Sequence, residues 1–184
     1  MDKYLSLIEN GSDAYINSLE KIGWFTVPQN DKQIVAKCLA DTDNNKYLVF
    51  GLAHLSFDAE SFDKANDYRR LLDKIAALAG FTVVSSQFEY NYGEESETLR
   101  GTINTAGNTY NFELEELFGE WYHPDFTKFL NQELLPGERV DSCFFDLPGI
   151  DQGINFVFVP QAIYNKAIEE EIIPNMDYFI ENFE

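Results

Sequence analysis

The residues from Phe81 to Phe118 alternate between apolar and polar side chains over three successive runs. Alternation with period two is typical of β-strands that place one face on a core. The second link, Ala106-Gly107-Asn108, is short and contains glycine, which favours a tight hairpin. The first link, GEESE, reads as a more exposed, charged turn. The sequence therefore predicts three consecutive antiparallel strands over this stretch.

Strand alternation also predicts which side chains share a face. In the first run, one face is expected to carry Val84, Ser86, Phe88, Tyr90 and Tyr92, and the other Phe81, Val83, Ser85 and Gln87. In the second and third runs, the apolar positions are Leu99, Gly101, Ile103, Tyr110, Phe112 and Leu114.

Helical periodicity surrounds these strands. We predict helices over Ala59–Ala79, from Pro124 to the Pro136-Gly137 stop, and from Pro160 onward. Further strands are expected at 139–147 and 154–159, and the apolar run Tyr47–Phe50 is predicted to be a central strand covered on both faces. Runs of strands with helices at the sides favour an α+β fold: a single domain over residues 1–184 with a mainly antiparallel sheet flanked by helices.

Composition supports a folded core, because 45% of the 184 residues are hydrophobic and 15% are aromatic. No run approaches the 18 apolar residues of a membrane span, and the N-terminus lacks a signal-peptide pattern. Cys38 and Cys143 lie in separate apolar runs, as buried thiols in a reducing compartment do. We therefore expect a cytoplasmic protein that does not bind membranes.

The charge is strongly negative and uneven. The formal net charge is -19, with 9 basic and 13 acidic side chains in residues 1–92 but 4 and 19 in residues 93–184. Such a half should repel nucleic acid and attract basic proteins or cations. The alternative is an acidic surface that serves solubility alone.

Catalytic motifs are missing from the sequence. The only histidines are His54, in an apolar run, and His123, next to a proline, and no GxSxG, HExxH, CxxC or phosphate-binding glycine motif occurs. We expect a protein that is not an enzyme, with no cofactor and no metal. The numerous carboxylates keep one alternative open, a carboxylate- or metal-dependent enzyme.

Aromatic and acidic residues come together in and beside the three strands. Tyrosine supplies contact area and carboxylates steer association with a basic surface, so this combination suits a basic protein partner. The competing interpretation is that the aromatic side chains face the core. The predicted partner-binding residues are Tyr90, Tyr92, Glu94, Glu95, Glu97, Glu113, Glu115 and Glu116.

The stretch LPGERVDSCFFDLPGIDQGINFVFVPQAIYNKAIEE, a strand–turn–strand followed by a proline-started helix, resembles the C-terminal halves of immunity proteins from bacterial toxin–immunity and contact-dependent inhibition systems. The resemblance implies a cognate toxin, often a basic nuclease, that is bound tightly and blocked by charge and shape. A different interpretation of the same acidity is a DNA mimic that occupies a nucleic-acid-binding protein.

Overall fold

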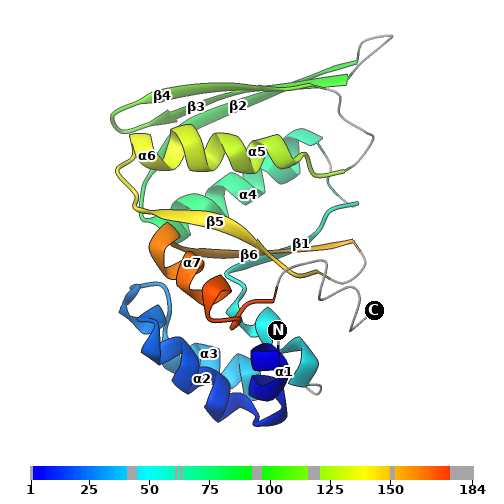
Figure 1. The fold of residues 1–184 in the computed structure, drawn as a ribbon. Coiled ribbons are helices and arrows are strands. Elements are labelled where there is room, and N and C mark those ends of the chain that lie inside the picture. Colours follow the sequence, from blue (N-terminus) through cyan, green and yellow to red (C-terminus); the bar gives the residue numbers. More distant parts are fainter. Residues whose placement is uncertain are drawn as a thin grey trace. The chain divides into compact units, whose positions relative to one another are not determined.

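The computed structural model describes residues 2–40, 45–60, 62, 64–92, 97–115, 121–149 and 152–174. The chain has the predicted α+β class, and the described residues form helices and two three-stranded antiparallel sheets (Figure 1). It divides into two compact units: unit 1 comprises Met1–Phe57 and Phe144–Glu184, and unit 2 is the continuous segment Asp58–Cys143. The single domain expected over residues 1–184 stays a prediction.

Unit 1 contains the N-terminal helices, the last helix and a sheet of strand order β1-β6-β5. The bounds are α1 Asp2–Glu9, α2 Ser12–Lys21, the 3-10 helix η1 Trp24–Thr26, α3 Lys32–Ala40, the 3-10 helix η2 Asn45–Leu52, β1 Leu55–Asp58, β5 Ser142–Leu147, β6 Gly153–Pro160 and α7 Gln161–Glu169. Strands β5 and β6 confirm the two strands predicted there, and α7 confirms the helix that follows Pro160.

The core of unit 1 is one cluster of buried apolar side chains. The apolar stripe of α2 packs inward with Tyr15 and Leu19, each 0% exposed, while β6 contributes Val157 and Val159. Trp24 is a fully buried member of the cluster and comes directly after Gly23, whose φ of 83° favours glycine. Burial of these large side chains is the main term that stabilises the unit.

The prediction of a central strand at Tyr47–Phe50 was wrong. These residues belong to η2, which buries Leu48, Val49 and Leu52. A short run that is apolar on every side suits a buried helix as well as a buried strand, because it has no periodicity to separate them. The strand comes later, as β1, and just before it the backbone N–H of His54 donates to the carbonyl of Phe156 at 2.8 Å.

Unit 2 contains the predicted three-stranded meander and its helices. The bounds are α4 Lys64–Ala79, β2 Val83–Tyr92, β3 Glu97–Thr105, β4 Thr109–Leu114, α5 Pro124–Phe129, the π-helical segment η3 Leu130–Leu134 and α6 Leu135–Gly137. The sheet order β2-β3-β4 with antiparallel pairing confirms the prediction. Helix α5 begins at Pro124 as predicted, whereas α4 begins later than Ala59.

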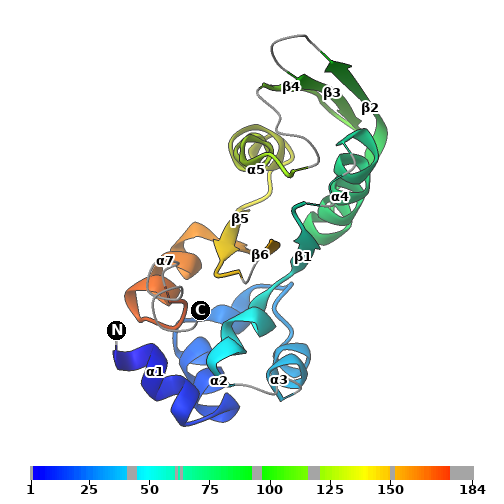
Figure 2. The same ribbon diagram turned by 90° about the vertical axis from the view of Figure 1, so that its right-hand side faces the viewer.

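Helices α4 and α5 cover the same face of this sheet (Figures 1 and 2). The ring of Phe112 in β4 lies 5.3 Å from that of Phe126 and 4.8 Å from that of Phe129, measured between centroids. On the same face, at the opposite edge strand, the guanidinium of Arg69 in α4 lies 6.0 Å from the ring of Phe88 in β2. We call the face covered by α4 and α5 the inner face. The opposite, outer face is covered by no helix among the described residues.

One predicted orientation in β2 was wrong. The pairing register of β2 and β3 shifts between Val83 and Ser85, so the alternation of β2 changes phase there. Val84 is consequently 67% exposed, although a regular strand would place it on the same face as Phe88, which is 9% exposed. An irregularity of this kind inserts a residue that the period-two pattern does not anticipate.

Candidate functional site: the outer face of the β2-β3-β4 sheet

Polar side chains form cross-strand rows on the outer face of the sheet. Successive side chains of a strand point to opposite faces, so burial of Leu99, Gly101 and Ile103 places the residues between them outward. The register then aligns residues of all three strands. The outer-face residues are Ser85, Gln87 and Glu89 of β2, Arg100, Thr102 and Asn104 of β3, and Thr109, Asn111 and Glu113 of β4.

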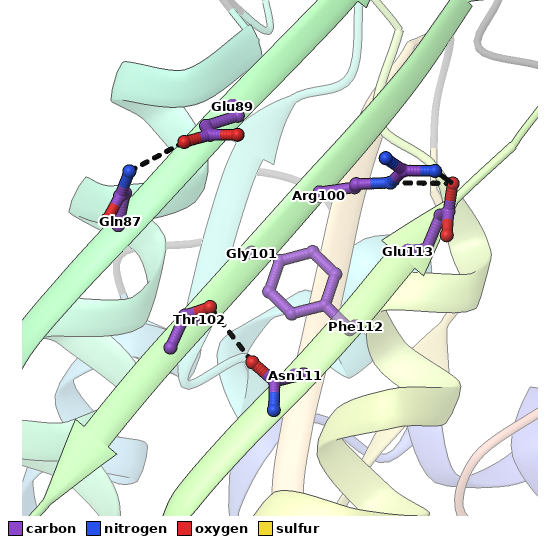
Figure 3. Close-up of a pocket in the computed structure, with 8 residues that line it drawn as sticks. All are labelled: Gln87, Glu89, Arg100, Gly101, Thr102, Asn111, Phe112 and Glu113. Carbon is purple, nitrogen blue, oxygen red and sulfur yellow. Dashed lines mark hydrogen bonds and ion pairs between the residues drawn. The ribbon is translucent and has the colours of Figure 1, made fainter.

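A shallow groove of about 480 Å³ lies on this face. Figure 3 shows its polar side chains standing on the three strands. Its lining residues are Gln87, Glu89, Arg100, Gly101, Thr102, Asn111, Phe112 and Glu113. The groove is therefore a hydrogen-bonding surface, with carboxylates at both of its edges in the sheet.

The charged row of the groove runs from Glu89 through Arg100 to Glu113. The Nε and Nη2 atoms of Arg100 donate to Oε1 of Glu113 at 2.9 and 2.7 Å. On the other edge strand, Gln87 donates from Nε2 to Oε1 of Glu89 at 2.6 Å. The row thus alternates negative, positive and negative across the three strands.

The neutral rows are linked by hydrogen bonds between side chains. Thr102 donates from Oγ1 to Oδ1 of Asn111 at 2.9 Å. In the next row, Asn104 donates to Oγ of Ser85 at 3.0 Å and accepts at Oδ1 from the hydroxyl of Thr109 at 2.7 Å. These bonds hold the side chains in defined positions on an otherwise open surface.

The electrostatic balance of the outer face is negative. The hydrogen bond to Glu113 raises the pKa of the Arg100 guanidinium, and the charges of Glu113, Glu89 and Glu115 raise it further. Glu115 is exposed directly after β4. Three carboxylates therefore act on a single guanidinium, and the surplus negative charge favours the approach of cationic groups.

The hairpin that carries this face is fixed at its tip. Oε1 of Glu138, directly after α6, accepts from Tyr110 at 2.7 Å, Thr105 at 2.8 Å and Asn108 at 3.0 Å. Burial works to raise the pKa of Glu138, but these hydrogen bonds outweigh it and hold the pKa below 4.5. The turn between β3 and β4 is thus bound to the end of the helical segment.

The predicted partner-binding residues are divided between the two faces. Glu113 lies on the outer face, with Glu115 just beyond it. The hydroxyl of Tyr90 donates to Oε2 of Glu97, and this pair lies on the side of the sheet that carries Leu99. The backbone of Tyr92 pairs with that of Glu97 in the sheet. The structure does not describe Glu94, Glu95, Glu116 or the side chain of Tyr92.

Most of the groove-lining residues were not predicted from the sequence. Gln87, Glu89, Arg100, Thr102 and Asn111 were not among the predicted residues, although they alternate with the apolar positions named for these strands. Leu99, Ile103 and Phe112 are buried in the structure, and the period-two alternation around them would have marked their neighbours as outward-facing. The competing interpretation of the aromatics holds for Phe88, which packs on the inner face.

The two histidines have structural contacts. Nδ1 of His54 accepts from the backbone N–H of Phe158 at 3.2 Å, and burial lowers the pKa of His54 below 6.5, against the effect of a hydrogen bond with the backbone of Gln29. Nδ1 of His123 accepts from the backbone N–H of Asp125 at 3.2 Å and so caps α5. Within the described part of the chain, no cluster of histidine, cysteine or acidic residues is arranged to hold a metal ion.

Comparison of the chain with protein-family models, with curated proteins and with solved structures finds no significant match. The helices that the structure describes include none that is both long and apolar enough to cross a membrane.

Proposed function

We propose that this chain is a non-catalytic acidic binding module that acts in the cytoplasm as an immunity or inhibitor protein and neutralises a basic toxin domain, such as a nuclease. The observation that supports this most is the outer face of the β2-β3-β4 sheet. It combines an open groove, ordered polar side chains and three carboxylates around one guanidinium.

The chemistry of the outer face favours binding over reaction. Its carboxylates are exposed and hydrogen-bonded to amide or guanidinium groups, whereas acid–base catalysis requires carboxyl groups whose environments separate their pKa values. Ordered acceptors on a rigid sheet are suited to meeting donors on another protein with little loss of side-chain freedom.

The net charge also supports binding to a basic domain, through electrostatic attraction that acts before the two proteins touch. A formal charge of -19, concentrated in residues 93–184, accelerates the encounter with a basic domain. Steered association of this kind reaches about 10⁸–10⁹ M⁻¹s⁻¹ at low salt and slows steeply as ionic strength rises. The proposal therefore predicts fast, salt-sensitive binding.

The direct test first asks whether a gene immediately upstream ends in a toxin domain, and then uses that domain as the binding partner. The chain should bind that domain in a pull-down and protect cells that express it. Charge reversal by Glu89→Lys or Glu113→Lys should reduce the association rate more than Asp73→Lys, which changes the net charge equally on an exposed position of α4. A chain that neither binds the domain nor protects cells would refute the proposal.

The carboxylates of the first turn provide a second arm of the test. Charge reversal at Glu94, Glu95 and Glu97 asks whether the partner also contacts the end of the β2-β3 hairpin. If this variant loses affinity while Glu89→Lys and Glu113→Lys retain it, the contact lies at the turn and the outer face is not the binding surface.

A further inference from the structure

Arg100 is the single cation among the residues of the outer face defined above. It stands on the central strand, between Glu89 and Glu113 of the two edge strands. In the free protein it neutralises part of the charge that would otherwise attract a basic partner. If Arg100 only repelled a basic partner, it would lower the affinity of the outer face. The geometry of its bond to Glu113 therefore matters for its role.

The bond between Arg100 and Glu113 is suited to exchange. Both donors of Arg100 end on the same oxygen, Oε1, so the pair lacks the two parallel bonds of a full guanidinium–carboxylate fork. The side chains of Arg100 and Glu113 are 61% and 39% exposed. Ion pairs with this exposure contribute little to stability, and water or another cation replaces them readily.

Arg100 also has alternative partners close by. Its pKa is raised by the charges of Glu89 and Glu115 as well as by Glu113, so all three carboxylates lie within electrostatic reach. When Glu113 is engaged by a different cation, the guanidinium can turn toward either of the other two. The exchange therefore leaves no charge buried or isolated.

We propose that the outer face receives an arginine side chain of a basic protein partner, and that Arg100 is a placeholder that releases Glu113 to this incoming guanidinium. The inference rests on the proposed function and adds the recognised group and the residue that gives way. A guanidinium fits better than an ammonium, because its five donors in a plane can form two parallel bonds to the Glu113 carboxylate and still reach the side-chain amide oxygen of Asn111 on the same strand.

The experiment uses a peptide of nine arginines as the probe and a peptide of nine lysines as its comparison. Binding is measured by titration at fixed ionic strength, and the Nε–Hε resonance of Arg100 is followed by NMR. In the wild-type protein this resonance should shift on addition of the arginine peptide, as its bond to Glu113 is lost. The lysine peptide should bind more weakly and move it less.

Matched variants separate the placeholder role from net charge. Arg100→Gln should tighten binding of the arginine peptide about two- to fivefold, in line with the small energies of exposed ion pairs. The control is Arg70→Gln, which removes one equally positive charge from an exposed pair with Asp67 on α4 and should have a smaller effect. Glu113→Gln should weaken binding more than Glu133→Gln, which changes an exposed carboxylate away from the sheet.

Each other outcome overturns the inference. Equal effects of Arg100→Gln and Arg70→Gln would show that only net charge matters, and weaker binding by Arg100→Gln would make Arg100 a contact residue. Binding without movement of the Arg100 resonance would place the site elsewhere and leave the proposed function standing. If neither peptide binds even at low salt, the proposed function fails together with the inference.

Discussion

The ring of Phe112 occupies the space that a side chain at Gly101 would need. A Cβ atom at Gly101 would lie 2.1 Å from Cε1 of Phe112, and the two residues are directly opposite on β3 and β4. Phe112 is itself held on the inner face by Phe126 and Phe129. An aromatic ring over a strand glycine restores the packing that the glycine lacks.

Gly101→Ala should therefore destabilise the protein. The ring of Phe112 has to leave its position between the sheet and α5, and overpacking of this kind costs about 1–3 kcal/mol in the free energy of unfolding. Urea denaturation measures the change. The control is Gly107→Ala in the β3-β4 turn, where a Cβ atom meets nothing within 4 Å. Similar losses for both variants would show that the contact with Phe112 is unimportant.

Glu138→Ala should loosen the tip of the same hairpin. The change leaves Thr105, Asn108 and Tyr110 without their shared acceptor, and loss of hydrogen bonds to a charged group costs about 1–3 kcal/mol. Glu133→Ala, at an exposed position of the preceding helical segment, should cost less than about 0.5 kcal/mol.

The stabilisation by Glu138 should also depend on pH. Its pKa is below 4.5 in the folded protein, so its contribution is complete above 4.5 and is lost as the pH falls through the lower folded value. The difference in unfolding free energy between wild type and Glu138→Gln should therefore shrink on acidification below pH 4.5. A difference that is constant with pH would contradict this assignment.

His54 should make unit 1 sensitive to mild acid. Because burial lowers its pKa below 6.5, the unfolded chain binds the proton more readily than the folded protein does. The stability is complete above pH 6.5 and falls as the pH decreases toward the folded pKa, where protonation also removes the acceptor of the Phe158 N–H. Thermal unfolding of His54→Gln should show a flatter pH dependence in this range, and an unchanged slope would argue against it.

Tyr15→Phe should destabilise the core of unit 1. The hydroxyl of Tyr15, which is 0% exposed, donates to the carbonyl of Ile172 at 2.8 Å, so its removal leaves a buried acceptor unpaired. The expected cost is about 1–3 kcal/mol in chemical denaturation. Tyr164→Phe provides the comparison, because the hydroxyl of Tyr164 donates to the backbone carbonyl of Asp146 over a longer distance, 3.3 Å, at an exposed position. An equal loss of stability in Tyr164→Phe would show that burial is not the cause of the loss in Tyr15→Phe.

The meander was predictable because its information is local. Alternation defines each strand, and short links leave antiparallel neighbours as the simplest pairing. The η2 helix was not predictable in the same way, since Leu48, Val49 and Leu52 become buried through packing with distant segments. The phase change at Val84 likewise depends on pairing with β3 and has no marker in the residues themselves.

The candidate site shows the same division. The presence of glutamates in these strands was evident from the sequence, but the face of the sheet on which each side chain lies depends on the pairing register. Glu97 and Glu113 both belong to strands, yet the first bonds to Tyr90 on the inner side and the second to Arg100 on the outer face. The Glu89–Arg100–Glu113 row exists only once all three strands are aligned, so composition alone could not distinguish it from the surrounding acidic residues.

The division of unit 1 into two chain segments has a consequence for the order of folding. Strands β2, β3 and β4 follow one another, so the meander needs only short loop closures and can form early. Strand β1 instead pairs with β6, and the backbone hydrogen bond from His54 to Phe156 lies beside this pairing. The whole of unit 2 is synthesised between the two strands, so β1 can pair only after β6 has been made. During synthesis the N-terminal helices therefore emerge long before the strands that complete their core. In a chain that stops before Phe144, we expect the β2-β3-β4 meander to be folded and the core of unit 1 to be incomplete.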